Sequence, residues 1–280
     1  MKRNAIIRMI LFAFLAVVLV GVLIAGIALK NYQMPSVVVR KSFDAPEVNN
    51  TKFDAKEIDR LKIEWAAGEI VLVPSDEDTI EINEQQLGSD KAMVLKKDGS
   101  TLYVQYCEGA VGLSFGPNNN LKKNLYVIVP RDWNCKELEI DAASATVKGE
   151  YLTIQELASS TASGTHTFTN CQVEKLKMDT VSGNLDFTGT LDKLDFNGVS
   201  AQANLVLSNQ PISIKLESVS GDLNLTLPEG CGFTLDKDTV SGRFSSELET
   251  REKNGKIVHG DGSCEIEVEG ISSSVHIRKG

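Results

Sequence analysis

The chain has 280 residues, 42% of them hydrophobic and 24% charged, and its 29 basic and 38 acidic side chains give a net charge of −9. This composition is that of a folded protein, and the length allows one large domain or two modest ones. The acidic balance argues against binding to nucleic acid and against tight contact with anionic lipids or wall polymers.

The amino-terminal region carries an uncharged apolar run, Met9–Leu29, which follows Lys2, Arg3 and Arg8. As a helix this run would span about 31 Å, close to the thickness of the hydrocarbon core of a membrane. It is longer than the apolar part of most cleaved signal peptides, which is the alternative. The run is therefore expected to be an uncleaved transmembrane anchor. The basic residues before it predict a cytoplasmic tail at 1–8 and a chain that continues outside the cell with 26 basic and 38 acidic residues, a charge of −12.

Residues 30–57 mix proline, asparagine and charged side chains, and we interpret them as a spacer between the membrane and a folded domain at 58–280. The first part of this domain, 58–135, alternates apolar and polar residues with a period of two, which is typical of β-strands. A Lys-Lys-Asp-Gly sequence at 96–99 predicts a hairpin turn between two of these strands.

Four aromatic residues lie near a loop that is rich in glycine and asparagine, at 109–120: Tyr103, Tyr106, Phe115 and Trp133. Exposed on a loop, such side chains would suit contact with a carbohydrate or a protein. Equally, they would cap the apolar end of the fold, and we favour this second interpretation.

A repeat occupies 136–248, and its mark is a corner with the sequence Val-Ser-Gly or a close variant. The later corners recur at spacings of 18, 20 and 21 residues, each between two short alternating runs. A fixed period near 20 indicates stacked units that bury their apolar faces against one another. The expected fold is an all-β solenoid (a β-helix-like stack). Glycine is expected to supply the backbone turn at the following corners: Gly68, Gly164, Gly183, Gly221 and Gly242.

Alternation within each unit assigns the apolar side chains to the interior and the charged residues between them to water. The predicted interior includes the corner valines. Between 176 and 240 it consists of Leu176, Met178, Val181, Leu185, Phe187, Leu194, Phe196, Val199, Leu205, Leu207, Ile212, Ile214, Leu216, Val219, Leu223, Leu225, Leu227, Phe233, Leu235 and Val240.

The spacing changes after residue 247. An Asn-Gly pair predicts an inserted hairpin at 249–262, which either contacts a partner or is a tolerated insertion. The basic residues that such a hairpin would present are Arg251, Lys253 and Lys256. Alternation returns in 263–280, which is expected to be the terminal rung that caps the stack, because an open sheet edge invites pairing with other chains.

These features resemble a bacterial family of β-strand-repeat proteins, the domain of unknown function 4097 (DUF4097), whose members include proposed adhesins. The resemblance lies in the opening strands at 63–70 and 80–84, in the strand at 123–130 that ends in Val-Pro, and in the Val-Ser-Gly corners. It implies a β-solenoid, often behind one N-terminal helix, in Gram-positive bacteria and others, with some relatives beside regulators of envelope stress. The chain departs from the family at three corner positions: Ala67, Ala145 and Ala201.

Catalytic patterns are weak. Alternation around His166 predicts an exposed strand position. Asp186 and Asp195 would line an acidic face as in β-helix polysaccharide enzymes, although solvated surface is the favoured interpretation. The five cysteines show no Cys-X-X-Cys spacing and are expected to be small buried side chains. We therefore expect no catalytic residues, no cofactor and no metal.

The sequence thus predicts a non-catalytic, single-pass membrane protein whose extracytoplasmic β-solenoid offers a scaffold or binding surface to an unknown protein or envelope polymer. One alternative is an accessory of an envelope-stress signalling system, acting through contacts of its membrane helix. The other is a carbohydrate-active enzyme with a β-helix fold.

Overall fold

The computed structural model describes residues 37–39, 47–48, 51–86, 92–107, 111–113 and 122–280. The predicted cytoplasmic tail, the apolar run and much of the predicted spacer lie outside these residues. Within them the chain is almost entirely β-strand, and no helix is long and apolar enough to cross a membrane. The elements are β1 (Val37–Val39), β2 (Glu47–Val48), β3 (Lys52–Asp54), the 3-10 helix η1 (Ala55–Glu57), β4 (Arg60–Ser75), β5 (Thr79–Gln86), β6 (Val94–Asp98), β7 (Thr101–Gln105), β8 (Val111–Leu113), β9 (Lys123–Pro130), β10 (Asn134–Glu150), β11 (Thr153–Leu207), β12 (Ser213–Leu227), β13 (Phe233–Thr239), β14 (Phe244–Ser246), β15 (Arg251–Lys253), β16 (Lys256–His259) and β17 (Cys264–Lys279).

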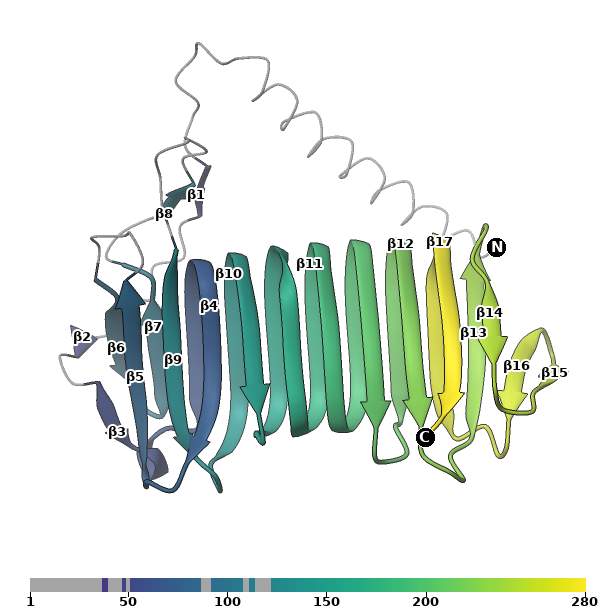
Figure 1. Cartoon of the computed structure of the whole chain (residues 1–280), viewed down its shortest axis with the longest axis horizontal. Helices are drawn as coiled ribbons and strands as arrows, with labels where there is room; N and C mark the ends of the chain where they lie inside the picture. Colours follow the sequence, from purple (N-terminus) through teal and green to yellow (C-terminus); the bar gives the residue numbers. More distant parts are fainter. Residues whose placement is uncertain (1–36, 40–46, 49–50, 87–91, 108–110, 114–121) are drawn as a thin grey trace, which may run out of the picture.

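Long parallel strands form the body of the molecule, a solenoid (Figure 1). In spatial order these are β4, β10, β11, β12 and β17, each paired in parallel with the next. Each rung bends at the predicted corner, so that one strand contributes to two faces of the stack. Within β11 a second set of bends, at Asn170 (φ +54°) and Gly189 (φ +132°), leads the chain from one rung to the next. The half before the corner forms the leading face, and the half after it forms the trailing face. The 55-residue β11 passes through three corners, at 162–164, 181–183 and 199–201.

The interior consists of columns of apolar side chains that stack from rung to rung. In one column Phe196 pairs in register with Leu216, and Leu216 with Val268, and all three are buried. The parallel pairing satisfies the backbone hydrogen bonds of each rung, and the stacked side chains exclude water from the interior. The expected all-β stacked fold is confirmed.

A Cβ would collide with neighbouring atoms at each of the predicted corner glycines, and at two of them the backbone conformation also requires glycine. Gly68 has φ +116° and Gly164 has φ +149°, a region that other residues rarely adopt. A Cβ on either would lie 2.1 Å from a carbonyl oxygen of the neighbouring rung, that of Lys123 or Ala145. Alanine occupies the same corner position at 145 and 201, so glycine is a local requirement and not a rule of the repeat.

The C-terminal end is threaded out of sequence order, which corrects the prediction that 263–280 is the terminal rung. β17 lies between β12 on one side and β13 with β14 on the other, so β13 and β14 form the last rung of the stack. The predicted hairpin at 249–262 is present as antiparallel β15 and β16, and it pairs with β13. Lys237 is consistent with this order: it occupies the core column beside Val268, and β16 pairs with β13 only at Phe233–Leu235, so no described strand pairs with Lys237 on its outer side. Its Nζ donates to Thr239 Oγ1 (2.6 Å) and to the carbonyl of Gly242 (2.9 Å).

The N-terminal end is threaded in the same way. β4 lies between β10 and a rung formed by β7 and β9, and β5 and β6 continue the sheet outward. β6 and β7 form the hairpin that the sequence at 96–99 predicts. The predicted spacer boundary at 57 is too late, because β3 pairs with β5 and Phe53 is buried in the core.

Candidate docking surface along the corner edge

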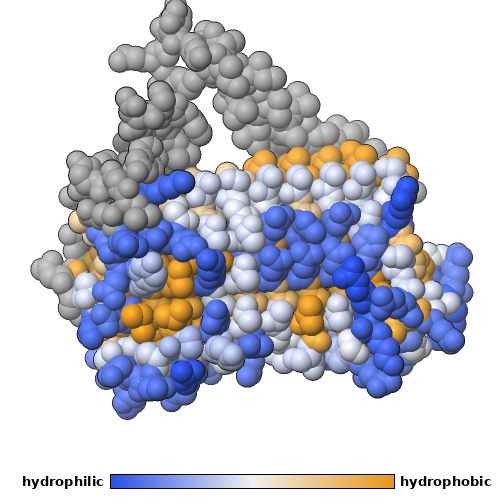
Figure 2. Space-filling model, in the orientation of Figure 1, coloured by the Kyte–Doolittle hydropathy of each residue, from blue (hydrophilic) through white to orange (hydrophobic). Residues whose placement is uncertain are grey.

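Five β-branched apolar side chains project into solvent along the corner edge of the solenoid. They belong to successive rungs and form what we call the valine ridge: Val181, Val199, Val219, Ile271 and Val240, in spatial order. Val181 is 40% exposed and Val240 64% exposed, and the other three are partly exposed. Figure 2 shows apolar atoms in a row along this edge. In the rungs nearer the N-terminus the same position is alanine, at 66, 143 and 162.

The ridge corrects the prediction that the corner valines point inward. Before the second corner of β11, the inward residues are Met178 and Thr180; after it, they are Gly183 and Leu185. The alternation therefore changes phase, and two consecutive residues, Val181 and Ser182, face water. The chain bends there, and neither residue can reach the interior. Ile212, also predicted inside, is 54% exposed because it lies in the turn before β12.

Polar groups fill the space beneath the ridge. Ser218 and Ser273, both buried, lie with their Oγ atoms 2.8 Å apart, and Ser273 also donates to the carbonyl of Ser218. In the rung before the ridge, Thr161 donates to the carbonyl of Ser163 (2.9 Å), whereas Thr180 Oγ1, beneath Val181, is buried and has no partner among the described residues. These bonds satisfy backbone groups where the strand bends, and so they fix the bend that exposes the ridge.

A row of carboxylates runs parallel to the ridge on the leading face. In each rung concerned the carboxylate comes two residues before the ridge position, and we call these residues the acidic row: Glu64, Asp141, Asp179, Glu217, Glu269 and Asp238, in spatial order. Ser160 and Asn197 hold this position in two intervening rungs. Four of the five ridge rungs thus carry an acidic side chain beside the apolar one.

The acidic row is only partly neutralised. Lys215 Nζ lies 2.6 Å from Glu217 Oε1, and Lys177 Nζ lies 3.3 Å from Asp179 Oδ2. Glu269 and Asp238 form no salt bridge with a described residue. Burial raises the pKa of Glu269, and the neighbouring carboxylates Glu267 and Glu217 raise it further. Negative charge is therefore crowded where the ridge is most exposed.

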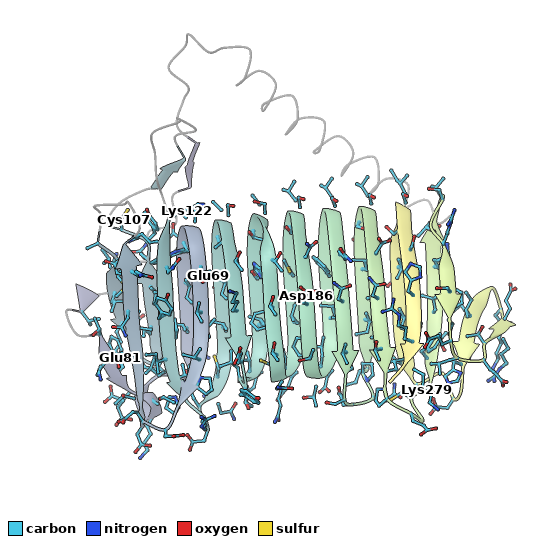
Figure 3. The ribbon with its side chains drawn as sticks, in the orientation of Figure 1. Glu69, Glu81, Cys107, Lys122, Asp186 and Lys279 are labelled. Atoms are coloured by element: carbon cyan, nitrogen blue, oxygen red, sulfur yellow. The ribbon has the colours of Figure 1, made fainter. Side chains whose placement is uncertain are left out.

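The trailing face next to the ridge is polar but mostly uncharged, and it carries an amide ladder. Asn204 Nδ2 donates to Asp186 Oδ1 (2.7 Å), and Asn224 Nδ2 donates to Asn204 Oδ1 (2.8 Å) (Figure 3 labels Asp186). Asp195 lies before its corner, on the leading face, where it accepts a hydrogen bond from Asn197. Because Asp186 and Asp195 occupy different faces, they do not form the pair of carboxylates that a glycosidase needs.

The aromatic residues singled out in the sequence lie in the N-terminal part of the solenoid. Tyr106 and Trp133 are buried, Tyr103 is half-buried, and Phe115 lies outside the described residues. Trp133 Nε1 donates to the carbonyl of Ile58 (2.7 Å), and the ring of Tyr106 packs edge-on against Trp65. Burial of this kind favours the capping interpretation.

A buried lysine, which the sequence reading missed, lies in the same region. Lys123 Nζ is 2.7 Å from Glu84 Oε2, donates to the carbonyl of Tyr106, and lies 4.1 Å from the centre of the Tyr106 ring. The sequence did indicate this burial, because Lys123 precedes Leu125, Val127 and Val129 at the inward spacing of β9. The fully buried ammonium is satisfied by these groups, which gives it a structural role in joining β5, β9 and the end of β7.

The hairpin residues have different surroundings. Arg251 and Lys253 are exposed, and Arg251 Nη2 donates to the carbonyl of Gly260 (3.1 Å). Lys256 Nζ lies 3.0 Å from Asp236 Oδ2, and this hydrogen bond raises the pKa of Lys256. Lys256 therefore ties the hairpin to β13, which leaves Arg251 and Lys253 as the accessible pair.

The remaining titratable groups do not assemble a catalytic centre in the described part of the chain. His166, expected on the surface, is fully buried, and neither of its ring nitrogens has a hydrogen-bond partner. Burial lowers its pKa to about 4. All five cysteines are buried free thiols, as expected, and burial raises the pKa of Cys135 and Cys264 to about 12. No group of His, Cys, Asp or Glu side chains among the described residues is arranged to hold a metal ion.

The architecture and this edge define a β-repeat protein of the solenoid class whose distinctive surface is apolar and bordered by carboxylates. A family model described as Toastrack DUF4097 matches residues 58–194, which cover the N-terminal rungs and the start of the regular stack. No curated protein matches the chain.

Several solved structures are similar to the chain at 12% sequence identity. A “putative adhesin” from Bacteroides fragilis has a TM-score of 0.44, with 84% of this chain and 98% of that one covered. A “putative cell adhesion protein” from Clostridium sporogenes has a TM-score of 0.41, with 81% and 96% covered. A “putative adhesin” from Parabacteroides distasonis has a TM-score of 0.40, with 83% and 98% covered.

Proposed function

We propose that this protein is a non-catalytic scaffold of the bacterial cell envelope that binds a partner through the corner edge of its solenoid. The observation that carries the proposal is the valine ridge. Exposed apolar side chains contribute little to the stability of the fold. A contiguous row of them beside charged residues is typical of an interaction surface. The names of the distant solved relatives, which refer to adhesion, agree with a binding role.

The proposal includes attachment to the membrane through Met9–Leu29, with the solenoid outside the cell. Its support is the sequence: an uncharged run of sufficient length, preceded by basic residues. A surface held close to the membrane meets its partner at a high effective concentration, so that a modest affinity is enough for function.

The test is recovery of partners from cells. Tagged full-length protein would be cross-linked in native membranes, purified and identified by mass spectrometry. The matched control replaces Met9–Leu29 by an unrelated apolar helix of the same length. We expect one envelope component to be enriched with both forms. Enrichment that is lost in the control would point to the alternative role as a signalling accessory, and recovery of no specific partner with either form contradicts the proposal.

The enzyme alternative is tested on purified cell-wall glycans. We expect the wild-type protein and the Asp186→Asn variant to release no product from them. Product that appears with the wild type and disappears with the variant would replace the scaffold by a carbohydrate-active enzyme.

A further inference from the structure

We propose that the valine ridge and the acidic row together form a docking surface for one kind of occupant, an amphipathic helical segment of a partner protein whose apolar stripe is bordered by lysine or arginine. This inference rests on the proposed binding function and names the chemistry of the partner. Its evidence is the position, length and charge of the surface.

The ridge has a defined length. It begins at Val181 and ends at the outermost rung with Val240, whereas the rungs on the N-terminal side of Val181 have alanine at this position. Five rungs at about 4.8 Å per strand make a row of about 19 Å. An α-helix of about 13 residues covers this distance, and its pitch of about 5.4 Å is close to the rung spacing. Successive turns of such a helix would therefore meet successive ridge side chains.

The charges beside the ridge indicate which charged side chains should border the apolar stripe of the occupant. Asp179, Glu217, Glu269 and Asp238 follow the ridge along the leading face, while the positions on the trailing flank are Asn184, Gln202, Asp222, Ser274 and Arg243. One flank is thus acidic and the other mostly neutral. Because Glu269 and Asp238 form no salt bridge with a described residue and Glu267 crowds Glu269, basic side chains placed over this row would relieve repulsion as well as form ion pairs.

Two other occupants fit these observations less well. An anionic lipid surface would meet the acidic row and the charge of −12 outside the membrane with repulsion. A second copy of the chain, docked ridge to ridge, would bring two acidic rows together, and a single row of side chains buries less area than a stable dimer needs. Both are distinguishable outcomes of the test below.

The test uses the full-length protein in nanodiscs of phosphatidylcholine, with a photo-cross-linking amino acid in place of Ser220, which is exposed beside Val219. The probe is a synthetic 14-residue helical peptide with a leucine stripe bordered by lysine, and its matched peptide has glutamate in place of lysine. Covalent adducts at position 220 are measured by mass spectrometry as a function of peptide concentration, so that partition of the peptide into lipid does not contribute.

We expect the lysine peptide to form adducts at position 220 and the glutamate peptide to form essentially none. The double variant Val219→Ser with Ile271→Ser should weaken binding by about tenfold or more, because two apolar contacts are lost. The matched control, Val206→Ser with Ile212→Ser, changes two exposed apolar residues outside the ridge and should bind as the wild type does. Neutralising Asp238 and Glu269 to Asn and Gln should weaken binding by about threefold and reduce its dependence on salt.

Equal binding of the two peptides, or unchanged binding by the ridge variant, overturns the inference. Adducts with lipid in the absence of peptide, in nanodiscs of phosphatidylcholine with or without the anionic phosphatidylglycerol, would assign the ridge to a lipid surface. Adducts between two protein chains would assign it to a second copy, and either result overturns the inference. In native membranes, adducts from a cross-linker at Thr226 on the trailing face but not from Ser220 would leave the scaffold function standing and remove this site. No adduct from either position, together with no partner recovered from cells, would contradict both this site and the scaffold function.

Discussion

The interior column and the valine ridge contain similar apolar residues in the same rungs, but the column is buried and the ridge faces solvent. Phe196, Leu216 and Val268 are fully buried, whereas Val199, Val219 and Ile271, three residues later in each rung, face water. The residue type does not decide which environment a side chain occupies; the bend of the backbone at the corner does, because it changes the phase of the alternation. The comparison predicts that substitutions in the column cost stability and that substitutions on the ridge cost binding.

The largest effect is expected in the column. Phe196→Ala should lower the free energy of unfolding by about 3–5 kcal/mol, since it removes a buried ring and leaves a cavity between two rungs. Unfolding of the full-length protein in detergent would be followed by circular dichroism in urea. The control is Val199→Ala in the same rung, with an expected loss below about 0.5 kcal/mol. Similar losses for the two variants would contradict the division between column and ridge.

The next effect is a dependence of stability on pH. The pKa of His166 is lowered from 6.5 to about 4 by burial, so the unfolded chain takes up a proton at a higher pH than the folded one. The stability is fully present above about pH 6.5, falls as the pH is lowered towards 4, and by linkage the loss is about 3 kcal/mol.

His166→Leu is the variant that isolates this contribution. It should be at least as stable as the wild type at pH 7, because two unpartnered buried nitrogens disappear, and its stability should change less between pH 7 and pH 4. The measurement is urea unfolding at several pH values. An unchanged pH profile in the variant would show that His166 is not the responsible group.

A smaller effect is expected at the corner itself. Gly164→Ala places a Cβ 2.1 Å from the carbonyl oxygen of Ala145 at a φ of +149°, and we expect a loss of about 2 kcal/mol. Gly99→Ala is the control, since Gly99 also has positive φ but open space around it, and its expected cost is about 1 kcal/mol. The midpoints of thermal unfolding would rank the two variants, and the reverse order would argue against close contact between rungs at the corner.

The smallest effect is expected on the ridge. Val219→Ser removes an apolar side chain that is partly exposed, so the free energy of unfolding should change by less than about 0.5 kcal/mol. Urea unfolding is again the measurement. A loss above about 1.5 kcal/mol would mean that the side chain packs in the fold and is not reserved for a partner.

Much of the fold follows from local pattern. The period near 20, the Lys-Lys-Asp-Gly turn and the Asn-Gly hairpin predict stacked strands and two hairpins, and these are present. The order of the last strands was predicted wrongly because β13 and β17 have similar alternation, and alternation does not specify which strand pairs with which. Lys237 in the inward phase of β13 was the available signal, since a lysine in a core column needs polar partners for its ammonium group, and the end of a stack can supply them.

The candidate site was not predictable in the same way. The sequence displays the Val-Ser-Gly corners and the carboxylate two residues before most of them, but reading one alternating phase through each corner places the valines inside. The bend reverses this assignment, because two consecutive residues, such as Val181 and Ser182, face water at the corner and the alternation shifts by one residue. The buried positions of Tyr106, Trp133 and His166 were likewise set by contacts between distant strands.

The sequence by itself determined that this chain forms stacked β-rungs with a fixed corner, because the period of the apolar residues and the glycines of the turns act over short distances. The tertiary structure decided which strands lie at the ends, which aromatic residues are buried, and that the corner valines face solvent beside a row of carboxylates. These depend on the registration of rungs that are about 20 residues apart in the chain. Local patterns carry no information about a neighbour across that distance until the strands are in register.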